Sequence, residues 1–288
     1  MKIELSALLL ALARSLAPLG ALAIPVTAGT AELVTIRSCT VVTTGCDQIS
    51  PIVQSAYGGF PGAFSSSAST SLAGYGSASG SVALSGTVGA PVLRATATAE
   101  LGQRTNTNSV ALQSYTYTGA TTATRTFGGV LTYSQLVTGP HGPGVGDGIT
   151  ASIDIFSLSV SDIEVGGTSI SNFNALLNLF NLPGYTSLDF DSYVDSTTTT
   201  SGLGTLSATV TLSPGDTVWV RVLLQTPAAN GARIDASNTL ITSWDVTADL
   251  TPGAVSSVPE PSTLALLFIC ALVSITTVGR AKSRPSVD

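Results

Sequence analysis

Residues 205–226 read TLSATVTL, then SPGD, then TVWVRVLLQT, and this stretch decides the fold class. The segments Thr205 to Leu212 and Thr217 to Thr226 are rich in β-branched residues and alternate polar with apolar side chains, which predicts two strands. Between them, Ser213-Pro214-Gly215-Asp216 has proline and glycine at positions that favour a tight turn. The stretch therefore predicts a β-hairpin.

The same alternation recurs upstream. Val92 to Glu100 puts alanines on one face of a predicted strand and threonines on the other. A second predicted strand, Ile149 to Val165, has an apolar face composed of Ile153, Ile155, Leu158, Val160 and Ile163. Further strands are predicted within residues 33–57 (one or two short strands), at Val110 to Tyr117, and at Thr124 to Val137 with a bend or bulge at Gly128-Gly129.

Three segments do not fit this pattern. Residues 60–90 are rich in Ser, Ala and Gly, which is typical of a flexible linker, but the alternation within them favours a weakly ordered sheet. Thr138 to Gly148 is predicted to be a long loop that contains His141. A short helix is predicted to begin at Ser171 and to end before Pro183-Gly184, with apolar residues at helical spacing: Phe173, Leu176, Leu177 and Phe180.

These strands and turns predict an all-β fold. The spacing favours an antiparallel β-sandwich with jelly-roll-like or immunoglobulin-like layering and one short helix. A right-handed β-helix is the alternative, although no fixed-period repeat supports it. Trp219 and Trp244 are expected to be core or edge anchors of the sandwich.

Charge is sparse. Only 10% of the residues are charged and the formal net charge is −6. Residues 32–257 contain no lysine, so a nucleic-acid-binding surface is not expected. The acidic balance suits a soluble extracellular surface and does not favour polyanion recognition.

Catalytic signatures are lacking. The single histidine, His141, lies in a Pro/Gly-rich loop, and no Gly-x-Ser-x-Gly motif is found. Oxygen ligands for Ca²⁺ could come from Asp189, Asp191 and Asp195, but the spacing departs from an EF-hand loop and acidic turns explain these residues equally well. We therefore expect no enzyme activity, no cofactor and no metal.

Cysteine usage fits an exported protein. Cys39 and Cys46 enclose six residues, a length that can close as a disulfide loop or a hairpin in an oxidising compartment. A disulfide is favoured over two free thiols. Cys270 lies in an apolar segment and is expected to act as a small hydrophobic residue.

The N-terminal segment has the layout of a secretory signal peptide. Lys2 precedes an apolar stretch, and residues 1–31 are assigned to the signal. Cleavage could follow Ala21-Leu22-Ala23, Val26-Thr27-Ala28 or Gly29-Thr30-Ala31. An uncleaved anchor is the alternative. Signal peptidase and the Sec translocon are the expected partners, and residues 32–257 are the expected exported domain.

Residues 258–288 combine three features in a fixed order. Pro259-Glu260-Pro261 predicts an extended, exposed backbone, since proline restricts φ and cannot donate a hydrogen bond. Residues 262–279 carry no charge and are long enough for a short transmembrane helix. A basic cluster that would stop transfer and stay in the cytoplasm follows: Arg280, Lys282 and Arg284.

This tail resembles a PEP-CTERM sorting signal of exported Gram-negative bacterial proteins. Such a signal has a Pro-Glu-Pro motif, a transmembrane helix and an Arg-rich end, in this order. The resemblance covers about thirty residues of this chain. Ala236 to Leu240 also resembles a segment that precedes such signals. The resemblance implies an exosortase substrate held transiently in the inner membrane, then processed and moved to the cell surface or released. An ordinary C-terminal membrane anchor is the alternative.

Two functions are compatible with these features. The first is a structural or interaction protein of the cell surface or of an exopolysaccharide or biofilm matrix. The second is a polysaccharide-binding β-sandwich module, which would need a row of exposed aromatic residues. Tyr115, Tyr117 and Tyr133 are the candidates for that row, although tyrosines stacked inside the sandwich are the preferred interpretation.

Overall fold

The structure, a computed structural model, describes residues 28–41, 46–61, 64–137, 147–158, 184–196 and 200–253. All of these residues belong to one compact unit that ends at Val255. The described residues form strands and no helix. The strands are β1 (Ala28–Val41), β2 (Cys46–Pro61), β3 (Ser65–Leu72), β4 (Gly76–Ser85), β5 (Ala90–Ala99), β6 (Gln103–Tyr117), β7 (Ala123–Leu136), β8 (Ile149–Leu158), β9 (Tyr185–Asp195), β10 (Thr200–Leu212), β11 (Thr217–Ala229), β12 (Arg233–Trp244) and β13 (Leu250–Pro252).

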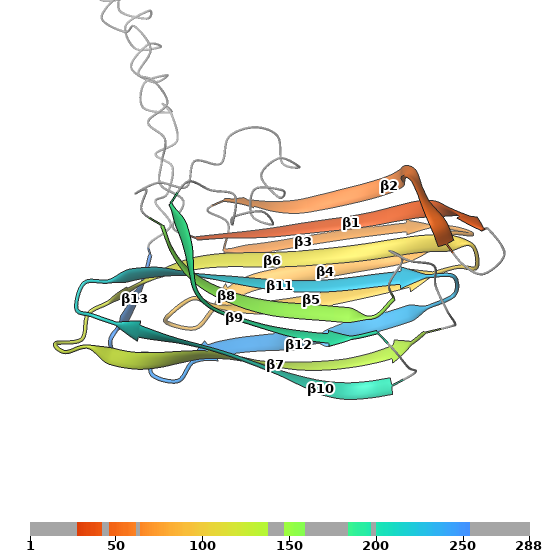
Figure 1. The fold of residues 1–288 in the computed structure, drawn as a ribbon. Helices are drawn as coiled ribbons and strands as arrows, with labels where there is room; N and C mark the ends of the chain where they lie inside the picture. The colour runs from red at the N-terminus through yellow and green to blue at the C-terminus, as the bar shows by residue number, and fades with distance from the viewer. Residues whose placement is uncertain are drawn as a thin grey trace, which may run out of the picture. The chain divides into compact units, whose positions relative to one another are not determined.

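Two antiparallel sheets pack face to face (Figure 1). Sheet A has the order β2-β1-β6-β11-β8-β9, and β13 also pairs with β6. Sheet B has the order β10-β7-β12-β5-β4-β3. The prediction of an all-β fold with two antiparallel layers is confirmed. The helix predicted from Ser171 lies outside the described residues.

The predicted hairpin at Ser213-Pro214-Gly215-Asp216 is wrong, although its strands and its turn are present. The Asp216 N–H donates to the Ser213 carbonyl at 3.0 Å, and Gly215 has φ of 89°. However, β10 pairs with β7 in sheet B, whereas β11 pairs with β6 and β8 in sheet A. The turn is therefore a corner between the two sheets, because a tight reversal does not decide which neighbour each strand will pair with.

The core between the sheets follows from period-two alternation. In β5, Ala95, Ala97 and Ala99 are buried while the threonines between them are partly exposed, as predicted. Larger side chains fill the end of the core near β13: the Trp244 ring meets Tyr115 and Phe127 edge-on, at centroid distances of 5.4 and 5.0 Å. Such edge-to-face pairs add to the hydrophobic gain from burial.

Small residues line the other end of the core. Residues 65–72 and 76–85 form β3 and β4, so this Ser/Ala/Gly-rich segment contributes strands to sheet B. A Cβ on Gly80 would collide with the carboxylate of Glu32, a fully buried residue of β1 in sheet A. The missing side chain thus allows the two sheets to approach closely. Oε2 of Glu32 accepts a hydrogen bond from Ser109 Oγ at 2.8 Å.

The outer face of sheet A, turned away from sheet B, carries a second apolar cluster. Phe156 stacks on Trp219 with a centroid distance of 6.5 Å and an interplanar angle of 17°. An ion pair lies beside them, since Arg221 Nη2 is 3.2 Å from Asp154 Oδ2 and both side chains are nearly buried. The other buried members of the cluster are Ala31, Val110 and Leu112. Both tryptophans are thus buried, as predicted.

Candidate functional site

All residues of the expected sorting signal lie outside the described part of the chain. This holds for Pro259, Glu260, Pro261, Arg280, Lys282 and Arg284, and also for residues 1–27 and 262–279. Within the described ranges, no helix has the length and apolar character needed to cross a membrane. β1 begins at Ala28, so the boundary expected after residue 31 falls within a strand.

Cys39 lies near the end of β1, and Cys46 is the first residue of β2. β1 and β2 pair antiparallel, with Cys46 opposite Val41 and Cys39 opposite Ile49. The two cysteines are therefore on neighbouring strands but not directly opposite each other. Diagonal neighbours are about 7–8 Å apart, slightly beyond the usual Cα separation in a disulfide. The disulfide remains a prediction.

The aromatic platform suggested for a polysaccharide-binding module is not at the surface. Tyr115 and Tyr117 are 0% and 2% exposed, and Tyr133 is 6% exposed. Tyr117 donates its hydroxyl to the Thr121 carbonyl at 2.8 Å. The preferred interpretation, that these tyrosines lie inside the sandwich, is confirmed, because the odd-numbered residues of β6 and Tyr133 of β7 face the core. They therefore cannot form the exposed row that glycan stacking would need.

The candidate calcium ligands have other partners. Asp189 and Asp191 lie on β9 and accept hydrogen bonds from the Thr209 and Ser207 N–H groups of β10 at 2.6 and 2.7 Å. Asp195 accepts from the Tyr133 hydroxyl at 2.5 Å. No group of three or more His, Cys, Asp or Glu side chains among the described residues could hold a metal ion. These aspartates instead connect the edges of the two sheets.

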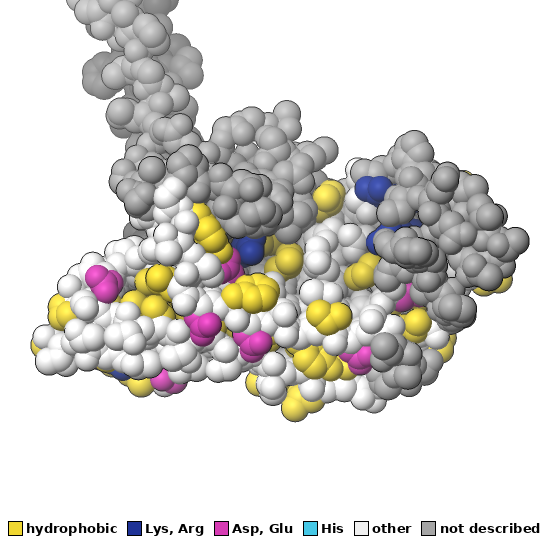
Figure 2. Space-filling view, in the orientation of Figure 1, with side chains coloured by type: hydrophobic (Ala, Val, Ile, Leu, Met, Phe, Trp, Pro, Cys, Tyr) yellow, Lys and Arg dark blue, Asp and Glu magenta, His cyan; other side chains and the backbone are white. Residues whose placement is uncertain are grey.

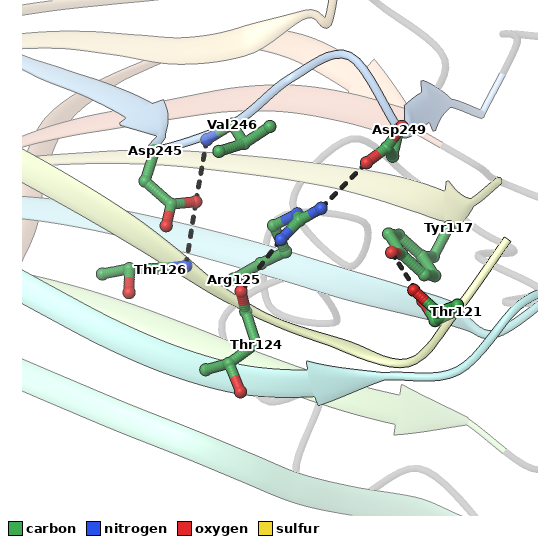
Figure 3. A network of polar contacts seen from close by, with 8 residues as sticks. All are labelled: Tyr117, Thr121, Thr124, Arg125, Thr126, Asp245, Val246 and Asp249. Carbon is green, nitrogen blue, oxygen red and sulfur yellow. Dashed lines mark hydrogen bonds and ion pairs between the residues drawn. The ribbon is translucent and has the colours of Figure 1, made fainter. Parts of the chain in front are cut away.

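A polar network fixes the region just before the C-terminal tail (Figure 3). Asp249 Oδ2 lies 2.8 Å from Arg125 Nη2, and the Arg125 guanidinium lies 5.4 Å from the centroid of the Tyr117 ring. Asp245 Oδ1 accepts from the Thr126 and Val246 N–H groups at 3.1 and 2.8 Å. These contacts secure the connection from β12 to β13 on the sandwich. The network joins the start of β7 to the segment between β12 and β13.

A shallow trough crosses the outer face of sheet B over β3, β4 and β5. It consists of two adjoining hollows of about 630 and 400 Å³ that share Ser67, Ser81 and Arg94. We call it the serine trough. Strand pairing arranges its polar side chains in two rows, Ser67, Ser81, Arg94 and Ser69, Ser79, Thr96.

A bulge in β12 forms one wall of the serine trough. Ala236 is opposite Ala95 and Leu240 is opposite Leu93, so three residues of β12 stand opposite Arg94 alone. In this bulge Thr239 has a backbone φ of 97°, a conformation that residues other than glycine rarely adopt. Arg94 Nε donates to Thr239 Oγ1 at 3.1 Å, which holds the guanidinium at the wall.

The chemistry of the serine trough is that of hydrogen bonding. Serine and threonine hydroxyls donate and accept, and the neighbouring strands that carry them lie about 4.8 Å apart. Ser79 Oγ and Thr96 Oγ1 already share a hydrogen bond at 2.7 Å. None of the described residues that line the two hollows is aromatic. The trough could hold a polar, hydroxyl-rich chain. Sequence reasoning missed it because the serine tract gave no indication of its position beside Arg94.

Comparisons with known proteins add little. No protein-family model and no curated protein matches this chain. Among solved structures, one similar chain is the enzymatically active domain of tailspike protein 4 of bacteriophage CBA120, with 8% sequence identity and a TM-score of 0.23. The alignment covers 64% of this chain and only 20% of the tailspike chain. Such a likeness carries no argument about function.

Proposed function

We propose that this chain is an exported, non-enzymatic structural or interaction protein of the cell surface or extracellular polymer matrix. The observation that carries the proposal is the order of features in the tail, in which Pro259-Glu260-Pro261, an uncharged segment and a basic cluster follow one another. Six residues separate the last described strand, which ends at Pro252, from this motif. An exosortase-type enzyme could therefore act beyond the folded domain.

The proposal includes the route of export. Residues 1–27 contain the apolar segment that signal peptidase and the Sec translocon would recognise, and residues 262–279 would hold the precursor transiently in the inner membrane. The sandwich would then face the outside. Jelly-roll-like or immunoglobulin-like layering is the finer architecture that we propose for it.

Intact mass and C-terminal peptide mapping of the protein from membrane and culture fractions test the processing. We expect the mature chain to lack everything after the Pro259-Glu260-Pro261 region. Replacement of these three residues by alanine should preserve the tail, whereas alanine at Ser256 and Ser257 should not. A mature wild-type chain that retains residues 264–288 in the inner membrane would contradict the proposal.

Polysaccharide binding remains the second candidate function, and the serine trough favours it. Two rows of hydroxyls and one arginine could hydrogen-bond a glycan chain without aromatic stacking. Ser67→Leu would fill the trough from an exposed position, and Ser243→Leu is the matched control on β12 outside it. On a glycan array we expect Ser67→Leu to reduce binding at least tenfold. Equal binding by the two variants would exclude the trough as the site.

A further inference from the structure

Two arginines stand directly opposite each other in sheet A. Arg37 of β1 is paired with Arg104 of β6. Their neighbours show which way they point, because Thr105 contacts the position where a Gly76 Cβ would stand in sheet B. Successive side chains alternate, so Arg104 and its partner Arg37 point to the outer face of sheet A. Like charges directly opposite each other destabilise a pair of strands.

The two arginines line a small cavity. Its volume is about 150 Å³, and its walls are Thr35, Arg37, Arg104 and Asn106. Thr35 is only 4% exposed. Arg104 Nη1 and Asn106 Oδ1 are buried and have no hydrogen-bond partner. The cavity is thus lined by guanidinium, hydroxyl and amide groups, and one strong donor is unused.

The charge balance of the cavity is positive. Burial lowers the pKa of Arg104, the charge of Arg37 lowers it further, and the nearby Asp147 raises it. Two guanidinium groups therefore face one carboxylate, in a chain whose formal net charge is −6. In Figure 2, basic side chains gather at the end of the sandwich where β1 ends and β6 begins.

We propose that this cavity binds an oxyanion between Arg37 and Arg104. A guanidinium is a planar fork that bonds the oxygens of a carboxylate, sulfate or phosphate in pairs. A water molecule occupies about 30 Å³ in the liquid, so the cavity has room for one such group together with its remaining hydration. A bound anion would offset the repulsion between the two arginines and would accept a hydrogen bond from Arg104 Nη1.

The oxyanion has two possible sources. It is either a free anion or a carboxylate or sulfate group carried by an acidic polysaccharide. The second source rests on the proposed function in a polymer matrix, whereas the cavity itself does not. One anionic group at a time would enter, because Asp147 and the net negative charge of the chain oppose the approach of a dense polyanion.

Thermal unfolding of the full-length chain in neutral detergent tests the site. Sulfate is titrated against chloride at constant ionic strength, and its affinity is measured by calorimetry. We expect sulfate to raise the midpoint of unfolding of the parent chain. Arg37→Gln and Arg104→Gln should each weaken sulfate binding at least tenfold, while Arg233→Gln, an exposed arginine of β12, should leave it unchanged.

The unfolding midpoint in chloride alone separates binding from a structural role. Arg104→Gln should unfold at the same temperature as the parent or higher, because it removes a like-charge contact. A large loss of stability in chloride would instead assign Arg104 a structural role and overturn the proposal. So would the absence of any shift with sulfate, phosphate and acetate, or the same sulfate shift in the parent and both glutamine variants.

A second titration distinguishes the sources. A uronic acid oligosaccharide that binds the parent at least tenfold more tightly than acetate, and loses this advantage in Arg104→Gln, identifies the polymer as the ligand. Equal affinities for the oligosaccharide and for acetate would exclude the polysaccharide as the source of the oxyanion and would leave a free anion as the ligand. The intact-mass measurement of C-terminal processing does not depend on these anion titrations. A failure of the proposed function can therefore be told apart from a failure of the anion site.

Discussion

At the scale of single residues, Glu32 is the least expected group in the sandwich. It is fully buried between the sheets, with Oε2 bonded to Ser109 and Oε1 without a hydrogen-bond partner. Burial raises its pKa to about 9, although the bond from Ser109 opposes this rise. The carboxyl is therefore neutral in the folded protein at physiological pH. A neutral acid costs less to bury than a carboxylate.

The raised pKa of Glu32 makes stability depend on pH. The unfolded chain loses the proton near pH 4.5 whereas the folded chain keeps it up to about pH 9. The stabilising contribution is therefore complete below pH 4.5 and is lost as the pH rises toward 9, by about 1.4 kcal/mol per pH unit at most. Glu32→Gln cannot ionise, so it should be more stable than the parent at pH 8 and should show a flatter profile.

Denaturant unfolding at pH 5 and pH 8 checks this prediction. The difference in free energy of unfolding between Glu32→Gln and the parent should grow with pH. Taking this difference cancels the contributions of the other titrating groups, which the two proteins share. A difference that stays constant across this range would show that Glu32 is already charged in the folded state.

At the scale of elements, the edge of β10 is covered by side chains. The Ser207 and Thr209 N–H groups lie on the side of β10 away from β7, where another strand could pair. Asp191 and Asp189 of β9 accept hydrogen bonds from these two groups. An exposed strand edge invites association, and charged side chains placed over it prevent pairing. These aspartates therefore protect the edge and join sheet A to sheet B.

Removal of both aspartates should release the edge. We expect Asp189→Ala/Asp191→Ala to lose about 1 kcal/mol of stability per hydrogen bond and to gain an apparent mass that rises with protein concentration. Light scattering after gel filtration measures this mass. Glu100→Ala, a change at the exposed acidic residue that follows β5, also removes a negative charge and should behave as the parent does. Association of that control would attribute the effect to charge alone.

The elements also show where local sequence is sufficient. The alternation in β5 predicted its buried face, because one face of the strand meets the core whatever its neighbour. In β8 the prediction was correct for Ile153 and Ile155 but wrong for Leu158, which packs against the cluster on the outer face of sheet A. Pairing partners were not predictable, since the turn at Ser213 to Asp216 has the same local chemistry in a hairpin and in a corner. β9 was missed because its acidic residues suggested turns, and the bulge beside Arg94 has no sequence signal of its own.

At the scale of the whole molecule, the start of β1 limits where the signal can be removed. Ala28, Thr30 and Ala31 are fully buried, and Ala28 to Ala31 pair with β6 from Gln113 to Val110. Cleavage after Ala28 or Ala31 would remove part of this strand, while cleavage after Ala23 would leave it intact. We therefore expect the mature chain to begin at Ile24.

N-terminal sequencing of the exported protein checks this prediction. As a second measurement, a chain that begins at Glu32 should unfold at a lower temperature than one that begins at Ile24, because it lacks four residues of β1. A mature N-terminus at Gly29 or Glu32 would contradict the prediction and would mean that the sandwich tolerates a shortened β1.

The two ends of the described fold meet on β6. Ala28 is opposite Gln113 and Pro252 is opposite Tyr115, so β13 continues the line of β1 along the same strand. A tension applied through the C-terminal tail would first reach Gly253, which is hydrogen-bonded to Ser114 and Gln113 of β6, then the three residues of β13, and then the Arg125–Asp249 pair. Because β13 pairs with β6 over only three residues, it would separate before the longer strands do. In a protein tethered at this end, Gly253 and β13 would therefore be the first part of the sandwich to come away from β6 under load.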